Sequence, residues 1–173
     1  VRLALKYAID RKHLVKTILR GYGSLGNDHP IAAVNRYYAA DLPQRDYDPE
    51  KAKFHMDKAG IGQHKFKLHV ADAAFPGAVD SGVLYQEHAA KAGIDIQVVR
   101  VPDDGYWKEV WKKVDWCACY WTSRPTEYWM FSMAYAADAK QNDTMWNHPK
   151  FNQLLVDARA ELDETKRREM YVE

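Results

Sequence analysis

The chain has 173 residues, of which 47% are hydrophobic, and 25 Lys or Arg against 24 Asp or Glu leave a net charge of +1. This length predicts one compact domain with a real core. The charge balance excludes bulk electrostatic attraction to nucleic acid or to an acidic membrane. No apolar run approaches the ~20 residues of a membrane span.

Three helices are predicted in the first sixty residues. Apolar residues at helical spacing indicate helices over 1–9 and 11–20, with Asp10 as the N-cap of the second. A segment with little periodicity follows over 24–43, and a loop of that length is usually functional or packed on something else. Asp48 then caps a third helix, which has Pro at its first turn and ends at Gly60.

The middle of the chain has a βαβ pattern. A strand over 66–71, a helix over 79–92 and a strand over 94–101 favour parallel pairing, because such a crossover brings the chain back in the same direction. A helix over 103–113, capped by its leading aspartates, and a short buried strand over 116–120 complete this part. The predicted fold class is α/β, with a small, at least partly parallel sheet flanked by helices.

The last third is predicted to be helical. A polar turn over 122–126 leads into an aromatic helix that begins at Glu127. An amphipathic helix is expected over 149–162, and Asp163 caps a final helix over 164–173.

The polar turn is the strongest candidate for a recognition site. Pro125 restricts the preceding Arg124 to extended geometry, so the guanidinium is held in a loop. Tyr120, Trp121, Tyr128 and Trp129 frame it, and a guanidinium between aromatic walls suits a carboxylate or a phosphate. In the alternative interpretation the aromatic residues are core and Arg124 forms a surface ion pair.

No catalytic or metal site is predicted. Cys117 and Cys119 are two apart, which is poor spacing for a mutual disulfide. The seven His are scattered without metal-ligand spacing, and no nucleophile beside a base is recognisable. We therefore expect no cofactor and no metal.

An ordered set of short motifs runs through the chain. They are Val1-Arg2, Ala4-Leu5-Lys6-Tyr7-Ala8-Ile9-Asp10-Arg11, Gly21-Tyr22-Gly23, Tyr47-Asp48-Pro49-Glu50-Lys51-Ala52, Lys58-Ala59-Gly60, Gly93-Ile94, Trp121-Thr122-Ser123-Arg124-Pro125, Trp146 with Pro149, and Arg167 with Met170-Tyr171. The set resembles the second lobe of bacterial extracytoplasmic solute-binding proteins of ABC importers, in the peptide-, opine- and nickel-binding family 5.

The resemblance implies a binding protein, not an enzyme. Residues 1–173 would be a single α/β ligand-binding lobe of the type II periplasmic-binding-protein fold, cut from a longer two-lobed protein whose signal peptide and first lobe are missing. The solute would be peptide-like, opine-like or another anionic conjugate, bound in an interlobe cleft and delivered to membrane permease subunits. A periplasmic, monomeric protein that binds no nucleic acid is expected.

The same resemblance selects the candidate ligand-binding residues. The turn contributes Tyr120, Trp121, Arg124, Thr126 and Glu127. Thr126 stands where peptide-binding relatives have an Asp that pairs with the ligand's α-amino group, which favours an anionic ligand.

A second candidate segment lies in the long loop. The loop at 26–31 resembles the one that approaches the cleft in relatives and adds Asn27 and His29. Asp28, between them, has an ordinary Asx turn as its alternative role.

Two other classes of function remain open from the sequence. One is an α/β hydrolase or transferase that acts on an anionic small molecule through Arg124 and His29. The other is a structural adaptor domain whose aromatic residues are core. A binder would show saturable stabilisation without turnover, an enzyme would consume the solute, and an adaptor would ignore it.

Overall fold

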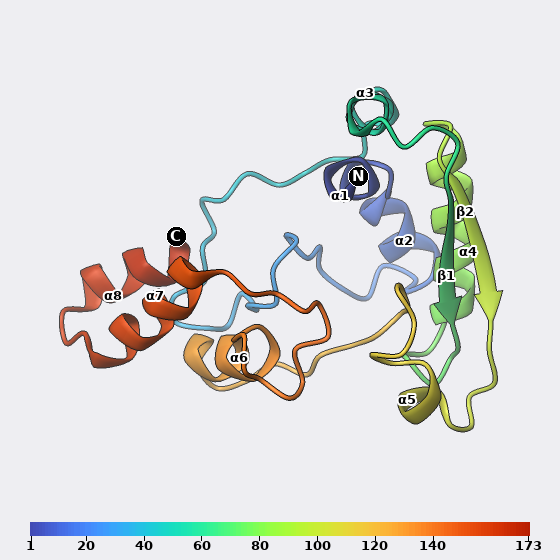
Figure 1. The fold of residues 1–173 in the computed structure, drawn as a ribbon. Coiled ribbons are helices and arrows are strands. Elements are labelled where there is room, and N and C mark those ends of the chain that lie inside the picture. The colour runs from blue at the N-terminus through green and yellow to red at the C-terminus, as the bar shows by residue number, and fades with distance from the viewer. The chain divides into compact units, whose positions relative to one another are not determined.

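The computed structural model describes residues 1–173 and divides into two compact units, each made of two chain segments (Figure 1). Unit 1 consists of Val1–Asp28 and Pro43–Tyr120. Unit 2 consists of His29–Leu42 and Trp121–Glu173. None of the helices combines the length and the apolar composition that a bilayer-spanning segment needs.

Three helices form the first part of unit 1, as the sequence predicts. They are α1 (Arg2–Tyr7), α2 (Arg11–Thr17) and α3 (Pro49–Ala59). The predicted caps are confirmed, because Asp10 accepts from the His13 amide and Asp48 accepts from the Lys51 amide, each at 2.9 Å. Helix α2 is shorter than predicted, since the chain turns left-handed just after it, with Arg20 at φ +51° and Gly21 at φ +84°.

The predicted βαβ unit is confirmed. Strands β1 (Lys65–Val70) and β2 (Asp95–Arg100) pair in parallel, and α4 (Ala78–Ala90) connects them. Alternation along the strands buries Val70 and Ile96 completely against α4 and α1. Gly82 of α4 allows this close packing, because a Cβ at that position would lie 3.1 Å from Cγ1 of Val70.

Two predictions for unit 1 are wrong. Residues 116–120 form no strand, and only a single parallel bridge joins Cys117 to His69. The helix predicted over 103–113 shrinks to α5 (Tyr106–Glu109), with Gly105 at its N-cap. Asp103 does not cap it, because its carboxylate accepts from the Ala73 amide at 2.8 Å.

Unit 2 contains the last three helices and a loop over 29–42 that has no helix or strand. The helices are α6 (Glu127–Ala134), α7 (Pro149–Ala160) and α8 (Glu164–Val172). Their starts agree with the prediction, and Asp163 caps α8 by accepting from the Lys166 amide at 3.0 Å. The small core of this unit is built on Ile31, Met130 and Ala134.

Candidate functional site

The turn before α6 is held in place by hydrogen bonds on both sides. Oγ1 of Thr126 accepts from the Trp129 amide at 3.2 Å, so Thr126 is the N-cap of α6. The Asn35 side chain, from the 29–42 loop, donates to the Arg124 carbonyl at 2.9 Å. Together these contacts fix the backbone on either side of Pro125, and with it the position of Arg124.

The Arg124 guanidinium does not use all of its hydrogen-bond donors. Its Nη1 donates to Oγ1 of Thr122 at 2.7 Å, whereas its Nε is buried and has no hydrogen-bond partner. The guanidinium forms no ion pair, so the alternative interpretation as a surface ion pair is wrong. A half-buried cation with an unused N–H is suited to an anionic group.

Glu127 lies deeper than the sequence suggests. It is 3% exposed, and its Oε1 accepts from the Tyr37 amide at 2.8 Å. Glu127 is also the first residue of α6. Glu127 therefore links α6 to the 29–42 loop, and it makes no ion pair with Arg124.

The aromatic residues around the turn do not all face Arg124. Trp121 is half-buried beside the Met130 core, and its Nε1 donates to Asp143 at 3.3 Å. Tyr128 instead contacts Arg159, whose Cζ lies over the Tyr128 ring, 5.3 Å from the ring centroid. Trp129 remains 51% exposed.

The other predicted ligand-binding residues divide between the two units. Tyr120 and Asn27 belong to unit 1, where Tyr120 is exposed and its ring centroid lies 5.6 Å from that of Trp107. His29 belongs to unit 2, and its Nδ1 accepts from the Ile31 amide at 3.3 Å. Trp121, Arg124, Thr126 and Glu127 lie near one another because they are close neighbours in the chain, in and beside the turn before α6.

Unit 2 also contains a cavity of about 360 Å³ that the sequence did not predict. His29 and Glu127 line it, and the hydroxyl of Tyr37, another lining residue, is buried without a hydrogen-bond partner. The walls come from four separate stretches of chain, within 29–42, 127–131, 146–155 and 170–173, so no local pattern marks the whole cavity. The apolar face of α7 is the one sequence signal. The lining residues not yet named here are Ile31, Ala39, Leu42, Phe131, Trp146, His148, Lys150, Phe151, Leu154, Leu155, Met170, Tyr171, Val172 and Glu173.

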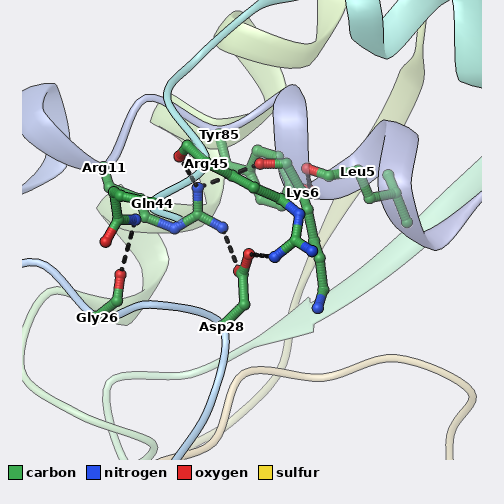
Figure 2. Close-up of polar contacts among 8 residues, drawn as sticks. All are labelled: Leu5, Lys6, Arg11, Gly26, Asp28, Gln44, Arg45 and Tyr85. Carbon is green, nitrogen blue, oxygen red and sulfur yellow. Dashed lines mark hydrogen bonds and ion pairs between the residues drawn. The ribbon is translucent and has the colours of Figure 1, made fainter. Parts of the chain in front are cut away.

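In unit 1, the Asp28 carboxylate accepts hydrogen bonds from two arginines (Figure 2). Arg11 donates to Oδ1 at 2.5 Å and Arg45 donates to Oδ2 at 2.7 Å. Arg11 also donates to the carbonyls of Lys6 and Arg45, at 3.1 and 3.2 Å. We call Asp28, Arg11 and Arg45 the Asp28 cluster. Both carboxylate oxygens are engaged by guanidinium groups, so this side chain has a structural role that differs from the Asx turn considered from the sequence.

A group of potential metal donors also lies in unit 1. Atoms of Asp10, His13 and His88 come within 4.8 Å of one another. Because His88 is 75 or more positions from the other two, their spacing in the sequence gave no sign of this.

Relatives with known names cover the whole chain. The dipeptide-binding protein of Escherichia coli (strain K12) is 28% identical over an alignment 185 positions long, which covers 99% of this chain and 34% of that protein. The chain therefore spans about a third of the length of this relative.

Solved structures show the same fold. NikZ from Campylobacter jejuni, solved in complex with Ni(L-His), has a TM-score of 0.85 and 22% identity, covering 98% of this chain and 37% of its own. AgaA from A. tumefaciens R10, solved with agropinic acid, has a TM-score of 0.82 and 22% identity, covering 98% and 36%. These neighbours are type II periplasmic binding proteins, which confirms the predicted fold class.

The description of the matching family model is "Bacterial extracellular solute-binding proteins, family 5 Middle", and the match extends over residues 1–143. This is more than four-fifths of the chain, and the family is one of solute-binding proteins, not of enzymes. The chain belongs to family 5 of the bacterial extracellular solute-binding proteins.

Proposed function

We propose that residues 1–173 are one ligand-binding lobe of a longer, two-lobed solute-binding protein that serves an ABC importer. The intact protein works outside the cytoplasmic membrane as a monomer. It binds a peptide-like or opine-like solute between its lobes and presents the closed form to the permease subunits. Family membership, the coverage of about a third of each relative, and relatives whose names refer to a dipeptide and to agropinic acid support this proposal.

The proposed ligand class rests on one observation, the guanidinium of Arg124, which has a donor without a partner. Its Nε is buried without a partner, and an unmet buried donor costs about 1–3 kcal/mol until an acceptor arrives. The solute that satisfies it carries a carboxylate or a phosphate. The rigid backbone around Pro125 and Thr126 means that little ordering is needed when the anion binds.

Lobe closure gives this contact its strength. A hinge motion that brings the missing lobe over the turn would exclude water from the guanidinium. In a less polar environment the charge-assisted hydrogen bond becomes stronger than it is in water. Binding therefore depends on both lobes, although Arg124 belongs to this one.

A solute panel tests the proposal on the intact protein. Each carboxylic acid is paired with its neutral amide, and affinity is measured by titration calorimetry for the wild type, Arg124→Ala and Arg124→Lys. Arg124→Ala should lose about 1.5–3 kcal/mol toward acids only, which is roughly 10- to 150-fold in Kd. Arg124→Lys should recover part of this, because it keeps the charge but not the planar fork.

Arg36→Ala is the matched control, because Arg36 of the same unit is exposed and pairs with Glu164. It should leave every affinity unchanged. If the amides bind as well as their acids, or if Arg124→Ala leaves all affinities intact, the anion is not recognised by this turn and the determinants lie elsewhere in the protein.

A further inference from the structure

His88 of α4 is a buried histidine with a defined hydrogen bond at each ring nitrogen. It is 3% exposed. Its Nδ1 accepts from the backbone N–H of Asp10 at 3.2 Å, and its Nε2 lies 2.9 Å from Nδ1 of His13. Through these two contacts it joins α4 to the first turn of α2. We call His13 and His88 the histidine pair.

The backbone contact determines where the protons are. A backbone N–H can only donate, so Nδ1 of His88 carries no proton. A neutral imidazole then has its proton on Nε2, and His88 donates to Nδ1 of His13. His13 must therefore also be unprotonated at Nδ1. The whole arrangement exists only while both rings are neutral.

The same protonation pattern disfavours a metal ion, although Asp10, His13 and His88 offer three donors within 4.8 Å. A neutral imidazole that binds a metal through Nε2 carries its proton on Nδ1. At His88 that proton would point at the Asp10 N–H, two donors facing each other. Ligands of a metal normally have an acceptor at this second position.

We propose that the histidine pair is an acid-sensitive link that holds the N-terminus of α2 on α4 when both rings are neutral and releases it when either ring is protonated. A proton added to His88 must go to Nδ1, against the Asp10 N–H. A proton added to Nδ1 of His13 meets the Nε2–H of His88. Each event replaces a hydrogen bond with two opposed donors.

The groups around His88 act in both directions. Asp10, the N-cap of α2, and Glu87 on α4 favour the charged ring, while His13 and Lys91 oppose it. The Tyr47 ring covers the imidazole, with centroids 5.4 Å apart, and its hydroxyl donates to the His88 carbonyl. Burial outweighs these charges and lowers the pKa of His88 below its usual value of 6.5.

The sign of the pH effect follows from that lowered pKa. Unfolded His88 takes up a proton near pH 6.5, whereas folded His88 takes it up only at lower pH. The unfolded chain therefore binds more protons in this window, and stability falls as the pH drops below 6.5. Above that pH the contribution of the pair is complete.

Release of this link would also weaken the Asp28 cluster. Arg11 follows Asp10 directly in α2, and it donates to Asp28, which ends the first segment of unit 1. If the first turn of α2 moves away from α4, the Arg11 guanidinium moves with it. Acid would then loosen the Asp28 cluster as well as the helix.

Imidazole ¹⁵N NMR on the intact chain tests the protonation pattern directly. At pH 7.5, His88 should have an unprotonated Nδ1 and a protonated Nε2, and it should titrate below pH 6.5. Urea unfolding at pH 7.5 and 5.5 tests the link. The midpoint of the wild type should fall at pH 5.5, and His88→Gln, which cannot titrate, should lose most of that fall.

His64→Asn is the matched control, because His64 is an exposed histidine of the same unit outside the pair. It should keep the full acid-induced fall, while His13→Ala should reduce it. A protonated Nδ1 on His88, a His88 pKa at or above 6.5, or an unchanged fall in His13→Ala would overturn the proposal. If His88→Gln does not fold, the NMR titration and His13→Ala still decide.

Discussion

Nη2 of Arg11 lies 2.5 Å from Oδ1 of Asp28, and both side chains are largely buried, with 17% and 9% of their surface exposed. Asp28 holds this position with a left-handed backbone, at φ +58°. Asn adopts that conformation readily, but Ala does not. Charge and backbone can therefore be tested separately at this one residue.

We expect Asp28→Asn to destabilise the chain by about 2–3 kcal/mol, because it leaves two arginines without their carboxylate. Asp28→Ala should cost about 1 kcal/mol more, since it adds left-handed strain. Urea unfolding measures both. Lys53→Ala, which breaks the exposed pair with Asp57, is the control and should change nothing measurable. Equal losses for Asn and Ala would show that the backbone strain is negligible.

Trp121 should contribute to stability as well as to any binding surface. A side chain that only lined a binding surface would cost little stability when removed. In the structure it packs beside Met130 and donates to Asp143. We expect Trp121→Ala to lower the free energy of unfolding by about 2 kcal/mol. Trp121→Phe, which keeps most of the area but not the hydrogen bond, should lose less than half of that. An unchanged melting temperature in Trp121→Ala would show that this packing does not stabilise the chain.

Glu127 is predicted to be structural. Glu127→Gln keeps an acceptor for the Tyr37 amide and should cost under about 1 kcal/mol, whereas Glu127→Ala leaves that amide unpaired and should cost about 1–3 kcal/mol. Thermal unfolding measures both changes. Solute affinity of the intact protein should stay the same in Glu127→Gln. A large loss of affinity in this variant, with stability retained, would instead make Glu127 a ligand-binding residue.

Gly82 should resist substitution although it lies inside a helix. Ala is about 1 kcal/mol better than Gly in a helix interior, but here its Cβ would crowd Cγ1 of Val70 at 3.1 Å. We expect Gly82→Ala to destabilise the chain by about 1 kcal/mol net. In a Val70→Ala background the same change should be neutral or stabilising. A double-mutant cycle by urea unfolding measures the coupling, and additive effects would rule out a steric cause.

Local signals in the sequence predicted the starts of the helices that an Asp side chain caps and the end of α3, which Gly60 marks. The start of α3 is encoded by Asp48 and the Pro that follows it, and the end by Gly60, which lies at φ +64°. Asp163 marks the start of α8 in the same way. The capping residues hydrogen-bond to backbone groups within three positions, so these helix ends can be predicted from a short stretch of sequence.

Long-range contacts decided the features that the sequence did not reveal. Residues 116–120 have strand propensity, but only His69 offers them a backbone partner. The Ala118 carbonyl accepts instead from the Tyr106 hydroxyl, at 2.6 Å. The candidate residues of the turn before α6 could be identified from the sequence, because they are contiguous. The unit 2 cavity and the Asp28 cluster could not, because their members are separated by long stretches of chain.

The two-segment construction of unit 2 has a consequence for how the chain folds. Asn35 and Tyr37 find their partners Arg124 and Glu127 only 89 and 90 positions later. One segment of unit 1 precedes the 29–42 loop, and the other lies between this loop and Arg124. The local helices and the βαβ unit of unit 1 can therefore form first. Closure of such a long loop is entropically costly and slow. The 29–42 segment is then the last part to dock, and refolding should show a late phase that mutations at Asn35 slow and mutations in β1 do not.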